Sequence, residues 1–168
     1  MEWVEFLSKQ VALFSEVPKE ILLHDILPQG QIQDLAKNQF IVTPQQVVNR
    51  FGIVLAGKIN IIHFLADGRY SLMSTLLPSD LFGMDLICTK SRVSPYHAVA
   101  AEQTKIISFP ATLLTEPGGI PEIHRQQLIT NSLTHISNEN LKKEYRLAIL
   151  AQKGIRERII TYLTMQAS

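Results

Sequence analysis

The chain has 168 residues, of which 46% are hydrophobic and 18% are charged, and its formal net charge is +1. This length corresponds to one ordinary domain, which can bury a core without the help of metals or disulfides. The composition excludes a disordered segment, and the near-neutral charge excludes a strongly basic nucleic-acid binder. The single cysteine, Cys88, has no partner for an internal disulfide.

The first residues of the chain do not resemble a secretory signal. Acidic side chains stand within residues 1–10, where a signal peptide would be basic, and no long apolar run follows. Elsewhere, no stretch approaches the roughly 18 uninterrupted apolar residues that a membrane helix needs. We therefore expect a cytoplasmic protein without a membrane partner.

The first part of the chain is expected to be helical. Apolar residues recur at helical spacing from Trp3 to Phe14, and this helix is predicted to end near Pro18. A second short helical stretch covers residues 21–26 and breaks at residues 27–30, where proline and glycine stand.

From about Gln39 the hydrophobic pattern becomes that of strands. Short runs rich in Ile, Val, Leu, Phe and Tyr recur at about ten-residue intervals, which indicates antiparallel strands. Turns are predicted at 66–68, because Asp-Gly tolerates the positive φ of a tight turn, and at 78–80. No helix separates the runs, so a parallel sheet is disfavoured and an α+β fold built on an antiparallel β-roll or jelly roll is predicted. The strand-like runs are 39–48, 51–65, 69–77, 96–102 and 104–109.

After residues 116–122 the chain runs to Leu150 without proline or glycine, which predicts one helix of about 45 Å. One seam of this helix has apolar ends and a polar middle, as in a two-stranded coiled coil whose register Asn140 sets. The alternative is an amphipathic helix lying on its own sheet, with Asn140 and Lys143 at the edge of the apolar stripe. The predicted dimer seam consists of Ile129, Leu133, Ile136, Asn140, Lys143, Leu147 and Leu150.

Several short motifs follow one another in a fixed order. The positions are Leu55 and Gly57 before a strand, Asp67 and Gly68 in a hairpin, Gly83 after a Phe, and Ala100, Glu102 and Thr104 before the last strand. This order resembles the CRP/FNR superfamily of bacterial transcription regulators, and the resemblance covers essentially the whole chain. One departure is Ser79, which stands where the family usually has the glycine of a Gly-Asp pair.

The resemblance implies a sensor β-roll at 1–116, a dimerisation helix at 117–151, and at 152–168 the first helix of a DNA-binding domain. The remainder of that domain, a winged helix-turn-helix, is absent from this chain. We therefore expect a homodimer that would contact DNA only through the absent part, and no measurable DNA binding by the chain as given. Gly154 is the expected hinge.

Residues 81–100 occupy the place of the family's phosphate-binding cassette. In cyclic-nucleotide binders of this family, a Gly-Glu pair binds the ribose and an Arg-Ser or Arg-Thr pair binds the cyclic phosphate. Both anchors differ here, since Met84 and Asp85 follow Gly83, and residues 94–96 (Ser-Pro-Tyr) replace the arginine pair, with Arg92 two residues away. The resemblance implies an effector other than cyclic AMP, with a cyclic-nucleotide-binding regulatory module as the alternative.

The middle of the long helix would border the same pocket if the resemblance holds. Lys143 would suit an anionic effector there, whereas the alternative has it pointing to solvent or pairing with Glu139. The effector and any cofactor are not identifiable from the sequence. The predicted effector pocket consists of Gly83, Met84, Asp85, Arg92, Ser94, Tyr96, Asn140, Lys143 and Glu144.

The remaining special residues favour ordinary structural roles. His63 and His97 could ligate haem iron or a metal, but isolated histidines at unrelated spacing are typical of strand positions. A cupin-like metal enzyme would need clustered His and Glu, a spacing that the sequence lacks. Cys88 is expected to be buried packing rather than a redox sensor, and one thiolate cannot hold an iron–sulfur cluster. We therefore expect no metal site, no catalytic residues and no enzyme.

Overall fold

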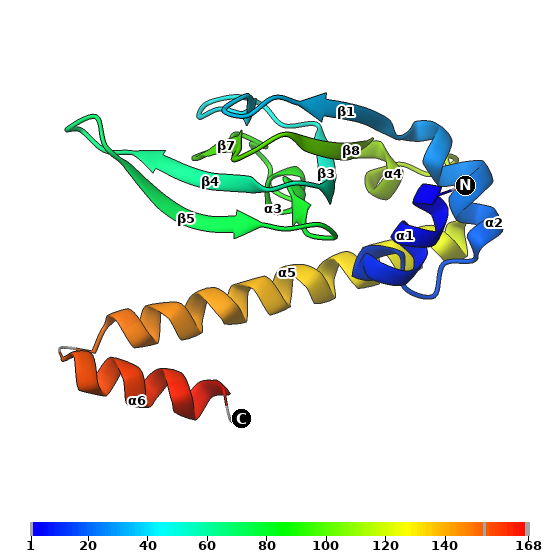
Figure 1. Cartoon of the computed structure of the whole chain (residues 1–168). Helices are drawn as coiled ribbons and strands as arrows, with labels where there is room; N and C mark the ends of the chain where they lie inside the picture. The colour runs from blue at the N-terminus through cyan, green and yellow to red at the C-terminus, as the bar shows by residue number, and fades with distance from the viewer. Residues whose placement is uncertain (1, 153, 167–168) are drawn as a thin grey trace. The chain divides into compact units, whose positions relative to one another are not determined.

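The computed structural model describes residues 2–152 and 154–166. The chain divides into two compact units, and the boundary in the sequence lies between Asn131 and Ser132. The long helix α5 (Glu122–Leu150) begins in the first unit and ends in the second (Figure 1). Within these ranges, no helix has the length and apolar character needed to cross a membrane.

The first unit contains two four-stranded antiparallel sheets, which confirms the predicted α+β fold with a β-roll (Figure 1). The first sheet has the order β1-β8-β3-β6 and the second has the order β2-β7-β4-β5. The strands of the first sheet are β1 (Gln31–Leu35), β8 (Thr104–Pro110), β3 (Arg50–Ala56) and β6 (Leu81–Phe82). Those of the second sheet are β2 (Phe40–Val42), β7 (His97–Ala100), β4 (Ile59–Phe64) and β5 (Tyr70–Leu76).

The buried faces of the sheets and the N-terminal helices supply the core. Phe109 of β8 contacts Phe51 of β3 and Phe14, with ring centroids 5.7 Å and 5.8 Å apart. All three rings are fully buried, as expected of a close-packed interior. The guanidinium of Arg50 crosses from β3 to β8, where Nη2 donates to the Ser108 carbonyl at 2.6 Å.

The N-terminal segment is more broken than the sequence suggested. Helix α1 (Glu2–Gln10) ends before the predicted end near Pro18, and short turns replace the rest of the helix. The short elements are the 3₁₀ turn η1 (Ala12–Phe14), α2 (Lys19–Ile21), the π turn η2 (Leu22–Ile26) and the 3₁₀ turn η3 (Leu27–Gln29). The side-chain amide of Asn131 in α5 donates to the carbonyls of Leu13 and Ser15 at 2.9 Å each. These hydrogen bonds connect the N-terminal segment to α5.

The predicted run 51–65 is divided at Gly57, so β3 and β4 belong to different sheets. Gly57 has φ +82°, and a Cβ there would lie 2.5 Å from the Gln103 carbonyl oxygen. A side chain is therefore excluded by both conformation and space. The amide of Lys58 then donates to Thr104 Oγ1 at 3.1 Å, which connects this corner to the start of β8.

Both predicted turns are confirmed. The hairpin between β4 and β5 closes with Leu65 N donating to the Arg69 carbonyl at 2.7 Å, and Gly68 has φ +82°. In the second turn, Ser79 has φ +79° and the Asp80 carboxylate accepts from Leu77 N at 2.8 Å. Ser79 therefore adopts a left-handed conformation at the place where the family usually has glycine.

Two strands were not predicted. Strand β1 has the sequence QIQDL, and four of its five residues are exposed, so it lacks the apolar run by which buried strands are recognised. It lies at the edge of the first sheet, paired with β8. The other missed strand is β6, which pairs two buried residues with β3 at the start of the predicted cassette.

The second unit consists of the later part of α5 and of α6 (Ile155–Gln166), as predicted for a long helix followed by a last helical segment. The long helix has 29 residues. Glu139 pairs with Lys142 Nζ at 2.6 Å, and Lys143 is exposed. Many apolar side chains of both helices are exposed, among them Leu133, Leu141, Tyr145, Leu147, Leu150, Ile155, Ile159 and Leu163.

Candidate effector site

The predicted cassette folds as a strand, a tight turn, a single helical turn and a loop. Gly83 follows β6 with φ +75° and begins α3 (Met84–Ile87). A Cβ at Gly83 would lie 3.1 Å from the Arg50 carbonyl oxygen, so the turn favours glycine. Met84 is buried with 2% exposure, whereas Asp85 faces out. Met84 is thus a core residue that fixes the cassette to the β-roll.

The loop after α3 is paired with residues 45–48 along its last part. Ser94 N donates to the Gln46 carbonyl at 3.0 Å, and Val48 N donates to the Arg92 carbonyl at 2.8 Å. Gln45 N donates to the Ser94 carbonyl at 2.9 Å. These backbone bonds fix the course of the loop between α3 and β7.

Arg92 does not stand in for the missing arginine anchor. Its Nη1 lies 3.3 Å from Asn49 Oδ1 in an exposed contact, and its backbone has φ +53°. The backbone amide of Arg92 donates to Thr89 Oγ1 at 3.0 Å. The guanidinium therefore contacts a neutral amide of the neighbouring segment.

Ser94 occupies the place of the arginine anchor and is 1% exposed. Its hydroxyl donates to the Tyr96 carbonyl at 2.8 Å and accepts from Tyr96 N at 3.2 Å. These bonds satisfy the hydroxyl within the loop itself. The buried side chain at this position is thus neutral and already paired.

The phenol of Tyr96 connects the end of the cassette loop to α3. The Tyr96 hydroxyl donates to Asp85 Oδ1 at 3.0 Å, which joins α3 to the end of the loop, 11 positions along the chain. Burial, with a further contribution from Asp85, raises the pKa of Tyr96 well above its ordinary value. The phenol therefore stays protonated and remains a donor. Of the predicted pocket residues, the structure brings together Asp85, Ser94 and Tyr96.

This arrangement differs from a phosphate site that is built on a guanidinium. Binding of that group relies on a guanidinium that forms two parallel charge-assisted hydrogen bonds. Here a satisfied hydroxyl of Ser94 fills the anchor position, and the carboxylate of Asp85 accepts from a phenol of the same chain. Neither residue presents a positive charge to an anion.

Cys88, at the end of α3, is exposed, so the expectation that it is buried packing is wrong. Partial desolvation, together with the Asp85 carboxylate, raises the pKa of its thiol. Nucleophilic and redox-sensing cysteines need a lowered pKa. The surroundings of Cys88 therefore do not favour a reactive thiolate.

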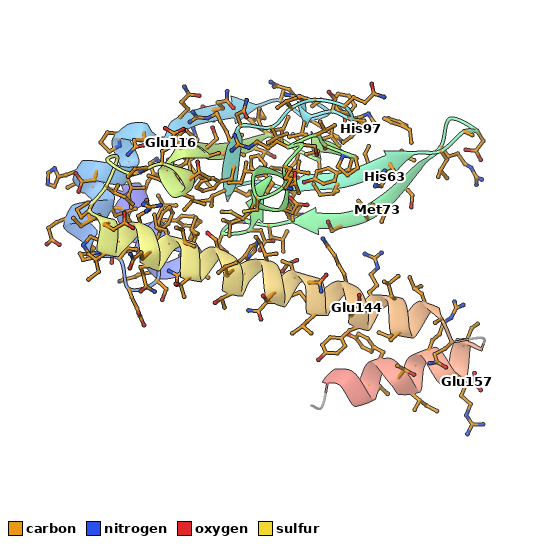
Figure 2. All side chains as sticks on the ribbon, turned by 180° about the vertical axis from the view of Figure 1, so that it is seen from behind. His63, Met73, His97, Glu116, Glu144 and Glu157 are labelled. Carbon is orange, nitrogen blue, oxygen red and sulfur yellow. The ribbon has the colours of Figure 1, made fainter. Side chains whose placement is uncertain are left out.

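The two strand histidines lie on the second sheet (Figure 2). The imidazole of His97 sits between Phe40 and Phe64, with ring centroids 5.5 Å and 4.8 Å away, and its Nδ1 is buried with no hydrogen-bond partner within the described structure. Across residues 2–152 and 154–166, no group of three or more His, Cys, Asp or Glu side chains is placed to hold a metal ion. The contacts of His97 with Phe40 and Phe64 were not predicted, because aromatic residues on neighbouring strands come into contact only after the strands pair.

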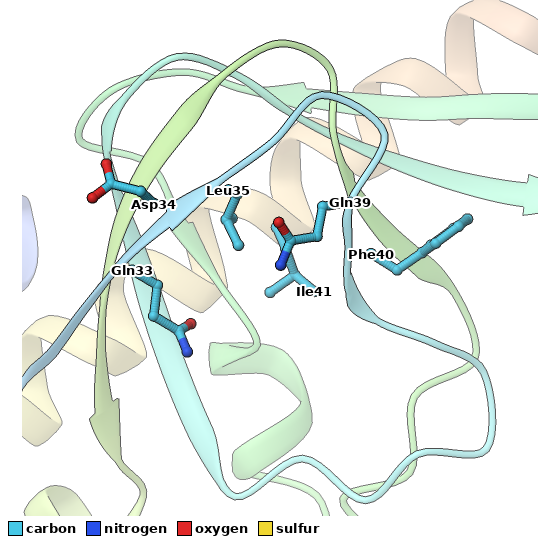
Figure 3. Close-up of a pocket in the computed structure, with 6 residues that line it drawn as sticks. All are labelled: Gln33, Asp34, Leu35, Gln39, Phe40 and Ile41. Atoms are coloured by element: carbon cyan, nitrogen blue, oxygen red, sulfur yellow. The ribbon is translucent and has the colours of Figure 1, made fainter.

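A surface pocket of about 390 Å³ lies where β1 and β2 meet, away from the predicted cassette residues (Figure 3). Two of its polar side chains have partners, since Asp34 pairs with Lys105 at 2.6 Å and Gln39 Oε1 accepts from Ala36 N at 3.0 Å. This pocket was not predicted, because the strand β1 that forms one side of it was missed. Its lining residues are Gln33, Asp34, Leu35, Gln39, Phe40 and Ile41.

The helix residues of the predicted pocket belong to the second unit. Asn140, Lys143 and Glu144 are exposed on α5. Their approach to the cassette stays a prediction.

The cassette lies within the part of the chain that a family model matches. The model of the cyclic nucleotide-binding domain covers residues 32–116, and the chain belongs to this family. The fold that the resemblance to the CRP/FNR superfamily implies is confirmed, since solved structures of transcription regulators share it. A comparison with curated proteins found no match.

Three solved structures illustrate the shared fold. Catabolite Activator Protein from Thermus thermophilus has a TM-score of 0.64 at 20% identity, and the alignment covers 83% of this chain and 63% of that protein. The sensor domain of the transcriptional regulator DNR from Pseudomonas aeruginosa has a TM-score of 0.63 at 14% identity, covering 92% and 99%. The regulatory subunit of a cAMP-independent protein kinase A from Trypanosoma brucei has a TM-score of 0.66 at 13% identity, covering 88% and 50%. This chain thus spans under two thirds of the length of the Thermus protein.

Proposed function

We propose that this chain is the effector-sensing and dimerising portion of a CRP/FNR-type transcription regulator, and that its effector is not a cyclic nucleotide. It acts as a regulatory protein in the cytoplasm rather than as an enzyme, and DNA is contacted by a further domain. One observation carries the proposal about the effector. The side chains at the two anchor positions of the cassette are neutral or already paired within the chain.

The energetic argument concerns the missing arginine. A hydrogen bond to a charged group contributes about 1.5 to 3 kcal/mol, and two parallel bonds also fix the orientation of the phosphate. Losing even one such bond weakens binding by roughly 10- to 150-fold, since 1.4 kcal/mol is a factor of ten. Ser94 cannot replace it, because a neutral hydroxyl that is buried and satisfied has to break its own bonds first.

The exposed apolar side chains of α5 support the proposed homodimer. Leu133, Leu147 and Leu150 of the predicted seam are 62%, 59% and 56% exposed, whereas Leu128 is fully buried in the first unit. Leu133 and Leu147 are two heptads apart and Leu150 is three residues further on, so the three side chains share one face of the helix, as is typical of a helix that packs on a second helix. Asn140 then stands in the middle of the seam as the polar residue that sets the register.

A thermal-shift experiment tests the proposed effector class. A ligand at a hundred times its dissociation constant adds about 2.7 kcal/mol of stability, or roughly 5 to 10 °C in the melting temperature of a domain of this size. We expect no shift with millimolar cyclic AMP or cyclic GMP, and a shift with another small molecule among haem, 2-oxoglutarate and small anions. A saturable shift of several degrees with either cyclic nucleotide would contradict the proposal.

A further inference from the structure

The phenol of Tyr96 gives the cassette a closing bond that needs no ligand. It reaches from the end of the loop back to Asp85 on α3, so the bond spans the entire loop. Asp85 is exposed, which lets water or a bound molecule compete for its carboxylate. A bond of this kind can be both formed and released in the folded protein.

One residue with positive φ lies in the same loop and another lies on the segment paired with it. Arg92 has φ +53° and Gln45, on the segment paired with the loop, has φ +65°. Non-glycine residues are uncommon in this region of backbone space and persist where the surrounding structure holds them. The backbone bonds from Val48 N to the Arg92 carbonyl and from Gln45 N to the Ser94 carbonyl do so here. The loop is therefore held in a conformation that it would relax from once released.

We propose that the hydrogen bond between Tyr96 and Asp85 is a latch, which holds the cassette closed without a ligand and whose release lets residues 88–96 separate from residues 45–48. In the closed state the phenol satisfies the carboxylate and the loop keeps its strained residues. In the open state the strain at Arg92 relaxes and the backbone bonds to residues 45–48 break. The inference builds on the proposed sensing role only in treating this segment as the cassette that moves.

Two physical features make the latch a discrete element. Tyr96 remains a donor over the whole physiological range, because burial raises the pKa of its phenol. Met84, Leu86 and Ile87 bury the other face of α3, so Asp85 is presented from a fixed position. The movement therefore falls on the loop rather than on α3.

Hydrogen exchange of the ligand-free chain tests the latch. The substitution Tyr96→Phe removes the hydroxyl and keeps the ring, and we expect the amides of Gln45, Val48 and Ser94 to exchange roughly ten to a hundred times faster. Amides of β8 should keep their wild-type protection. The matched control is Tyr70→Phe, because Tyr70 is exposed at the start of β5 and its hydroxyl makes no hydrogen bond within the described part of the chain.

A double variant shows whether the two side chains act as one pair. If the latch exists, adding Asp85→Ala to Tyr96→Phe leaves the loop exchange no faster than in either single variant. Additive acceleration, unchanged exchange in Tyr96→Phe, or acceleration spread equally over β8 would each overturn the latch. The measurement uses no ligand, so these outcomes are independent of the thermal-shift test of the proposed function.

Discussion

Substituting Gly52 should destabilise the β-roll at the strand that leads into the cassette. Gly52 lies in β3 opposite Phe82 of β6, the residue before the Gly83 turn. A Cβ at Gly52 would overlap ring atoms Cζ and Cε1 of Phe82 and would lie 2.7 Å from Cε2. Phe82 is 7% exposed, so the ring packs directly on the bare backbone of the neighbouring strand.

The stability cost of Gly52→Ala depends on whether the Phe82 ring stays in place or is expelled from the core. If the ring stays, overpacking costs about 1 to 3 kcal/mol, and if it is expelled, much of the roughly 3 to 5 kcal/mol of a buried phenylalanine is lost. Replacing glycine by alanine returns about 0.4 to 1 kcal/mol by restricting the unfolded chain. Because the Cβ overlaps the Phe82 ring, the ring cannot stay where it is, and the net expectation is a loss of about 2 to 4 kcal/mol from the free energy of unfolding.

Urea denaturation at equilibrium measures this loss. The control is Gly68→Ala, where a Cβ meets nothing within 4 Å and only the strain of φ +82° remains, at about 1 kcal/mol. In a Phe82→Ala background, Gly52→Ala should cost nothing, because the ring that it meets is gone. A single variant within 0.5 kcal/mol of wild type, or an equal cost in both backgrounds, would refute the reasoning.

Three further predictions concern other parts of the chain. Asn140→Leu should tighten dimerisation by roughly tenfold or more in sedimentation experiments, and Asn138→Leu, outside the seam, should not; equal effects would argue against the seam. The ammonium groups of Lys19 and Lys9 lower the pKa of Glu5 from 4.5 to about 2. The contribution of the Glu5 carboxylate to stability is therefore present above pH 4.5 and is lost as the pH falls toward 2. Glu5→Gln should therefore flatten the acid limb of a stability profile measured by urea denaturation, and an unchanged limb would count against the pair. Cys88 should react with iodoacetamide more slowly than a free thiol at pH 8, since its pKa is raised, and equal rates would contradict this.

The features that could be predicted from the sequence depend on neighbouring residues. Asp67 and Gly68 formed the expected hairpin because the positive φ of such a turn is a property of the residues themselves. The long helix α5 was predictable because no proline or glycine interrupts residues 122–150. The family resemblance depends on the order of such local signals, and the fold followed from it.

The missed features depend on which distant segments meet. Strand β1 is polar and exposed along most of its length, and it forms a strand because its backbone pairs with that of β8. The division of residues 51–65 depends on the close approach of Gln103 and Thr104 to Gly57, which no local pattern indicates. The pocket beside β1 was missed for the same reason.

By itself, the sequence indicated that the cassette departs from the family's two charged anchors, because that departure is a matter of residue identity at Met84 and Ser94. Only the tertiary structure decided what took their place. Tyr96 reaches Asp85 because α3 is packed on the core and the loop is bound to residues 45–48, and both contacts join positions far apart in the chain. Hydrogen bonds of this kind depend on distances of about 3 Å that side-chain identities alone do not set.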